Sequence, residues 1–267
     1  PEEPEEPEEP EEPEEPEEPE EPVLVPPSGA WRSADGDMLG LFAGNRMLLG
    51  GDRRVRDGDW ELNEDGSFGG VASGYAANGS ALPLPEPFTG EVSEGRMSLQ
   101  FTFFQNVSLE LAPAAAAGDR AELALIARQW TVIGDNGYVL VLPVGADGRL
   151  SGAGDSAGCL WDGSFTVPDD GVNVYAVELS LQASSPDACG GIEGGGYRGL
   201  ATMEGERLTV LAANGSSAIA IALGTEPPPA DDGDDGAGDD EDDEDDEERD
   251  DDADDEDDER DRPGRRR

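Results

Sequence analysis

The side chains that could carry out acid–base chemistry in this chain are almost all carboxylates. The chain has 64 Asp and Glu residues, no His, and 17 basic residues, all of which are Arg. Without His there is no imidazole base for a Ser or Cys nucleophile, and without Lys there is no Schiff-base amine. A carboxylate pair among Asp57, Asp59, Glu61 and Asp162 is of the kind that hydrolyses glycosides. Turns and solvated strand faces account for these residues better, so we expect no enzyme, no catalytic residue and no cofactor.

The two cysteines, Cys159 and Cys189, are the other chemically reactive residues. In a β-rich chain they suggest a disulfide and an oxidising compartment, and two buried free thiols are the alternative. A crosslink across this loop would contribute about 3–4 kcal/mol in the chain-entropy model. Two cysteines with carboxylates match known zinc sites poorly, so we expect no specific metal site.

Aromatic residues are the candidates for binding an apolar ligand. Trp31, Trp60, Trp161 and Phe165 could line a ligand cavity inside a barrel, and ordinary core packing is the competing interpretation. The basic cluster Arg53-Arg-Val-Arg56 could contact a phosphate or an acidic segment, or lie in a solvated loop.

Short alternating segments separated by turn signals must position these residues, and they predict β-strands. In the first half we expect strands over 29–33, 38–43, 46–49, 60–63, 67–75, 88–92, 96–105 and 107–111. In the second half we expect them over 138–144, 149–154, 159–167, 172–181, 197–203, 207–212 and 217–223. Between the halves, residues 122–133 favour a strand, and a short helix over 121–129 is the alternative because Ala, Leu, Glu and Arg favour helices.

The two halves resemble one another. Asp65-Gly66 followed by a Gly-rich strand and a later aromatic-x-Gly is echoed by Asp147-Gly148 and its continuation. We therefore predict an all-β fold, an antiparallel barrel or sandwich built from two related modules. The first module spans residues 23–134, and the second, with the cysteines, spans residues 135–225.

Charged low-complexity segments flank these modules, and the net charge of the chain is −47. Residues 1–22 repeat Pro-Glu-Glu, which predicts a stiff polyproline II spacer or a solvated tail without a role. Residues 226–267 are predicted to be a disordered acidic tail. The block Asp231–Asp261 could bind divalent cations weakly and diffusely, or serve only solubility. Such charge disfavours nucleic acid as a partner, because phosphates are repelled.

Over about residues 137–225, the second half contains the Asp147-Gly148 turn, Gly158-Cys159, Asn173-x-Tyr175, Cys189 and Tyr197-Arg-Gly-Leu-Ala201. In these residues it resembles an uncharacterised β-rich domain of proteobacterial secreted lipoproteins. The resemblance implies export and a Cys159–Cys189 disulfide, but no activity. It also implies membrane anchoring through a lipidated cysteine that this chain, which begins at Pro1, no longer carries.

From these observations we expect a non-catalytic exported protein of the bacterial cell envelope, in the periplasm or on the outer surface, or an extracellular protein. Its role would be structural or binding, and it would be displayed on the acidic polyproline spacer. One alternative is a lipocalin-like carrier of a small apolar ligand. Another is an extracellular appendage subunit that self-associates by strand addition, with Val23–Pro27 as the donor segment.

Overall fold

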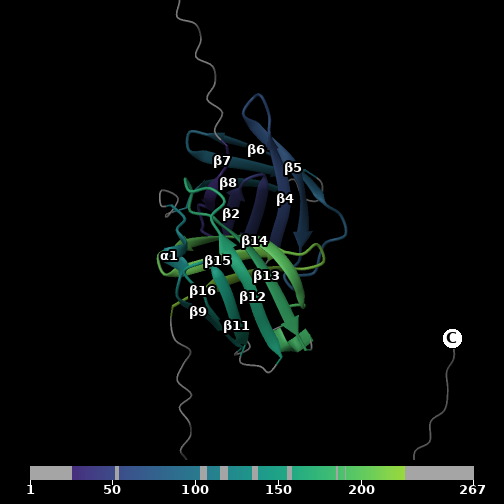
Figure 1. Cartoon of the computed structure of the whole chain (residues 1–267). Coiled ribbons are helices and arrows are strands. Elements are labelled where there is room, and N and C mark those ends of the chain that lie inside the picture. Colours follow the sequence, from purple (N-terminus) through teal and green to yellow (C-terminus); the bar gives the residue numbers. More distant parts are fainter. Residues whose placement is uncertain are drawn as a thin grey trace, which may run out of the picture. The chain divides into compact units, whose positions relative to one another are not determined.

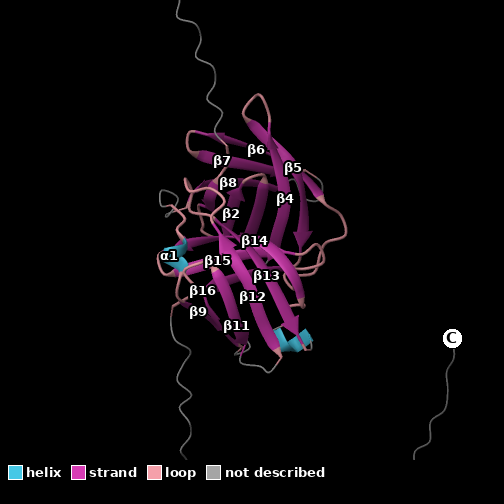
Figure 2. Cartoon of the chain, viewed as in Figure 1, coloured by secondary structure: helices cyan, strands magenta, loops and turns pink. Residues whose placement is uncertain are grey.

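Almost every element of this protein is a β-strand. In the computed structural model, residues 26–51, 54–102, 107–114, 120–133, 138–154, 158–184, 186–189 and 191–225 are described. The described residues form two antiparallel eight-stranded sheets, each of which follows the order of the sequence (Figure 1). Among the described residues, the helices are the four-residue α1 (Leu123–Ile126) and the 3-10 turn η1 (Pro186–Cys189) (Figure 2). The prediction of an all-β fold is confirmed.

The first sheet closes into a barrel. Its ends meet where β1 pairs with β8, with Trp31 opposite Pro113. Its strands are β1 (Gly29–Ser33), β2 (Met38–Ala43), β3 (Arg46–Gly51), β4 (Arg54–Leu62), β5 (Ser67–Tyr75), β6 (Glu86–Ser93), β7 (Arg96–Phe101) and β8 (Val107–Pro113).

The second sheet curls in the same way, but its terminal strands, β9 and β16, are not joined by a ladder. They are linked by a single bridge between Thr131 and Gly224. Its strands are β9 (Gln129–Ile133), β10 (Val139–Pro143), β11 (Arg149–Gly154), β12 (Cys159–Thr166), β13 (Tyr175–Ala183), β14 (Gly195–Glu204), β15 (Arg207–Ala213) and β16 (Ala218–Leu223).

The structure corrects the predicted boundary between the modules. We expected residues 122–133 to continue the first sheet as a strand. Instead, Leu123–Ile126 is helical, and β9 pairs with β10 in the second sheet. The change of sheet therefore lies between β8 and β9, not at residue 134. The spacer 1–22 and the tail 226–267 lie outside the described residues.

Both sheets belong to one compact unit and share a hydrophobic cluster. Strands β2 and β3 are buried along nearly their whole length because both of their faces are covered. Phe42 and Met47 pack inside the first barrel, whereas Leu41 and Leu48 pack against the second sheet. From the second sheet, Leu200 and Leu211 join the same cluster. Burial of large apolar side chains stabilises by about 1.5–3 kcal/mol each, so this shared cluster holds the two sheets together.

Polar contacts also link the two sheets. Arg32 of β1 forms an ion pair with Glu204 of β14. Arg46 of β3 donates a hydrogen bond of 3.2 Å to the carbonyl oxygen of Arg198. These contacts fix how the outer faces of β1 and β3 meet the second sheet.

Candidate functional site

The four aromatic residues predicted to line a ligand cavity lie in two separate cores. Trp31 and Trp60 pack inside the first barrel with Phe42, Phe68 and other apolar residues. Trp161 and Phe165 pack inside the second sheet, and both are almost completely buried. An eight-stranded barrel is just wide enough for side chains to fill it. The four residues therefore belong to hydrophobic cores and do not surround a common cavity.

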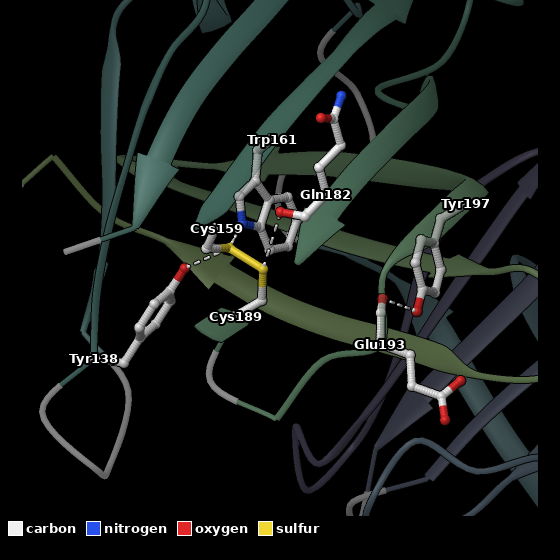
Figure 3. The surroundings of a disulfide bond; sticks show 7 residues. All are labelled: Tyr138, Cys159, Trp161, Gln182, Cys189, Glu193 and Tyr197. Atoms are coloured by element: carbon white, nitrogen blue, oxygen red, sulfur yellow. Dashed lines mark hydrogen bonds between the residues drawn. A yellow bond between two sulfur atoms is a disulfide. The ribbon is translucent and has the colours of Figure 1, made fainter. Parts of the chain in front are cut away.

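The two cysteines form a disulfide in the structure. Cys159 at the start of β12 is bonded to Cys189 in η1, with their Cα atoms 5.1 Å apart (Figure 3). The Tyr138 hydroxyl and the Trp161 indole N–H both point at the sulfur of Cys159, at 3.2 and 3.1 Å. The crosslink fastens the segment after β13 to the sheet.

A polar hollow of about 490 Å³ lies where the outer face of β4 meets the second sheet. It is lined in part by the bidentate ion pair of Arg46 and Asp57, with nitrogen–oxygen distances of 2.9 and 2.8 Å. Asp59, Ser73, Arg198 and Asn214 also line it, among others. Asp57 and Asp59 thus share this hollow, whereas Asp162 lies on β12 of the other sheet. Arg46 and Asp57 neutralise each other, and Asp59 and Arg198 add one further charge of each sign, so the charges lining the hollow balance and favour no ligand of one sign.

The basic cluster is only partly described, since Arg53 lies outside the described residues. Arg56 does not lie in a solvated loop but within β4. Its guanidinium is 3.6 Å from Glu86 and lies over the ring of Phe101. Burial lowers the pKa of Arg56, and Glu86 opposes this effect. The guanidinium therefore packs as part of the first barrel.

The terminal strands β9 and β16 approach each other along a line that is here called the seam. Along the seam the two strands are joined by one bridge instead of a ladder of hydrogen bonds. At one end of the seam, Thr131 and Gly224 exchange two backbone hydrogen bonds of 2.9 Å. At the other end, Ala218 N–H donates to the carbonyl of Gly79 at 2.9 Å. Ser80 also bridges Ser217, so the turn after β5 of the first barrel adds to β16 as a short extra strand.

Between these two ends, β16 has an unpaired edge at Ala220 and Ala222. Residues of an antiparallel strand direct their N–H and C=O groups alternately to the two neighbouring strands. The Ala218 N–H and the backbone groups of Gly224 form hydrogen bonds on the side of β16 that faces away from β15. Ala220 and Ala222 are separated from them by even numbers of residues, so their N–H and C=O groups point to the same side, into the seam. Within the described ranges, no residue forms a hydrogen bond to these groups across the seam, and both alanines are exposed.

Two hollows flank the unpaired edge. One, of about 490 Å³, is lined by Tyr197, Ala220 and Ile221, together with the turn at Asn78. The other, of about 460 Å³, is lined by Ile133 of β9 and by Ala222. Ile133 is 50 % exposed although it is large and apolar. The edge thus has space beside it and an apolar side chain across the seam, as a site for an added strand requires.

Three of the four tyrosines have pKa values raised above the usual value, chiefly by burial: Tyr75, Tyr175 and Tyr197. Near the seam, the Tyr197 hydroxyl lies 2.7 Å from the Ser217 hydroxyl and donates to the Glu193 carbonyl at 2.8 Å. Next to the polar hollow, the negative charge of Asp57 adds to the effect of burial on Tyr75.

We expect the protein to lose stability at alkaline pH because of these tyrosines. A raised pKa in the folded state gives stability that is present below the unfolded value of about 10 and is lost as the pH rises through the folded value. Urea unfolding on either side of about pH 10 checks the sign, and tyrosinate absorbance checks the cause. Titration of all four tyrosines at their ordinary pKa would contradict this prediction.

Sequence reasoning identified the disulfide but did not identify the seam. The sequence did contain a sign of an open strand edge, because Ala218-Ile-Ala-Ile-Ala-Leu223 places small residues on the outer face of a terminal strand. Whether the edges of a sheet meet depends on the curvature of all its strands, which no local pattern shows.

Within the part of the chain that the structure describes, no group of three or more acidic or Cys side chains is arranged to hold a metal ion. None of the described helices is long and apolar enough to cross a membrane.

Comparison with known proteins adds no relative. No family model, no curated protein and no solved structure matches this chain.

Proposed function

We propose that this chain is a non-catalytic, exported binding protein of the bacterial cell envelope or surface, and that it captures an extended peptide segment at the seam. The observation that carries the proposal is the edge at Ala220 and Ala222, which faces the seam between two hollows and has no hydrogen-bond partner there within the described residues. Export is supported by the Cys159–Cys189 disulfide, because such bonds persist in oxidising compartments.

The molecule itself provides a precedent for strand addition at this edge. The turn at Gly79 and Ser80 belongs to the first barrel, yet it pairs antiparallel with the beginning of β16. An added segment would continue that pairing along Ala220 and Ala222, towards Thr131. Each backbone hydrogen bond contributes about 1 kcal/mol net, so we expect weak binding of a short peptide, with a Kd of about 0.1–1 mM.

Strand addition also fixes the pattern of the bound segment. A residue opposite Ile221 lies on the same face as Ile221, which packs against the core of the second sheet. A residue opposite Ala220 or Ala222 lies on the outer, exposed face. The segment should therefore alternate apolar and polar residues. The carrier alternative lacks this kind of support, because Trp31, Trp60, Trp161 and Phe165 pack in two cores.

The test uses the full chain and the blocked peptide Val-Thr-Val-Thr-Val, which places Val opposite Ile221 and Thr opposite Ala220 and Ala222. In the free protein, the Ala220 and Ala222 amides should exchange with solvent at least about tenfold faster than those of Ile219 and Ile221, which face β15. Added peptide should slow exchange at the two alanines and shift their NMR signals. Equal and slow exchange in the free protein, or peptide shifts located elsewhere, would overturn the proposal.

Ala220→Pro is the matching variant. Proline is tolerated at a strand edge, where it removes only the N–H that faces the seam, so the β15–β16 ladder should survive. We expect it to abolish peptide binding, whereas Ala220→Thr, which keeps the N–H, should retain binding within about threefold. If both variants bind equally, the edge is not the binding site.

A further inference from the structure

The structure also points to the charge of the partner, an inference that rests on the proposed function. We propose that the segment bound at the seam is basic: an extended, alternating segment with Lys or Arg at both ends. The observation is the position of two exposed carboxylates, those of Glu193 and Glu206. Each lines the hollow at a different end of the unpaired edge.

The two carboxylates differ in their surroundings from other acids nearby. Glu204 lines the same hollow as Glu206, but its charge is balanced by Arg32. Glu193 and Glu206 have no ion pair within the described part of the chain. Arg207 also lines the second hollow, opposite Glu204 in the β14–β15 register, and like Glu206 it forms no ion pair within the described residues. A cationic side chain at each end of an added segment would therefore meet an unpaired carboxylate.

The charge of the whole chain favours the same partner and disfavours two others. At a net charge of −47, copies of this chain repel one another, and so do acidic peptides. The sequence after the seam continues with Glu226 and then with the acidic block from Asp231. A second copy as the strand donor, as in an appendage subunit, is thus disfavoured, whereas a basic segment is attracted before it contacts the edge.

The experiment compares three peptides that share the core Val-Thr-Val-Thr-Val and differ only in their ends: uncharged, Lys at both ends, or Glu at both ends. With the full chain at low ionic strength, the Lys-ended peptide should bind about threefold to tenfold more tightly than the uncharged one. The Glu-ended peptide should bind more weakly than both. The advantage of the Lys-ended peptide should shrink towards about 0.15 M salt, where charges are screened beyond about 8 Å.

Point variants show which carboxylates are responsible. Glu193→Gln and Glu206→Gln should each reduce the advantage of the Lys-ended peptide by about twofold to threefold and leave binding of the uncharged peptide unchanged. Glu91→Gln, at an exposed site on β6 of the first barrel, makes the same change in net charge and should have no effect.

The outcomes separate this inference from the proposed function. If the uncharged peptide binds at Ala220 and Ala222 but charged ends make no difference, the edge is a binding site and the basic partner is wrong. An effect of Glu91→Gln as large as that of Glu193→Gln would also overturn the inference, since net charge alone would then explain it. If no peptide protects the two alanines, the proposed function itself fails.

Discussion

Gly199→Ala is expected to destabilise the protein by about 3 kcal/mol, although it adds a single methyl group. Gly199 lies in β14, between β13 and β15. A Cβ atom there would lie 2.1 Å from the carbonyl oxygen of Leu211 and 2.5 Å from the Cβ of Ala212. The first of these atoms belongs to the backbone, so relief of the clash requires β14 and β15 to move apart.

Gly196→Ala is the matched control, three residues earlier in the same strand. Its Cβ would meet only the carbonyl oxygen of Leu179, at 3.9 Å, which is ordinary contact. We expect its free energy of unfolding to stay within about 0.5 kcal/mol of the original. Urea unfolding of both variants makes the comparison, and similar midpoints for the two would show that β14 does not approach β15 so closely.

Loss of the disulfide should have an effect of similar size. Cys159 and Cys189 are 30 residues apart, so the crosslink should stabilise the fold by about 3.5 kcal/mol by restricting the unfolded chain. In Cys159→Ser/Cys189→Ser the donors Tyr138 and Trp161 would also lose the sulfur that they now contact. Urea unfolding of the double variant measures the loss.

Reduction of the original protein provides the control for this variant. A reductant should lower the unfolding midpoint of the original protein towards that of the double variant, and it should leave the variant unchanged. An original protein whose midpoint does not respond to the reductant would contradict the stabilising role of the crosslink, even if the double variant were less stable for other reasons.

Strand positions in this protein were predictable because most strands have one buried and one exposed face. In β12, the alternation of Cys159, Trp161 and Phe165 with polar residues predicted the face that is in fact buried. The start of β4 was missed because Arg54 and Arg56 resemble a solvated loop. Glu86 and Phe101, which make Arg56 stable in a strand, are distant in the sequence.

The boundary between the sheets and the candidate site depend on longer-range structure. Residues 122–133 combine helix-favouring and β-favouring stretches, and the local pattern does not say which sheet receives β9. The sequence shows that β2 and β3 are apolar. It does not show that a second sheet covers their outer face. The unpaired edge at Ala220 follows from how far the second sheet curls, a property of eight strands together.

The pairing of the Gly79–Ser80 turn with β16 has a consequence for the order of folding. Every ladder of either sheet except β1–β8 joins strands adjacent in sequence, so most hairpins can form locally and early. The contact of Ser80 with Ser217 requires both sheets to be largely in place, because it joins residues more than half of the described chain apart. The seam is therefore expected to form last and to open first, which keeps its edge accessible while the rest of the molecule stays folded.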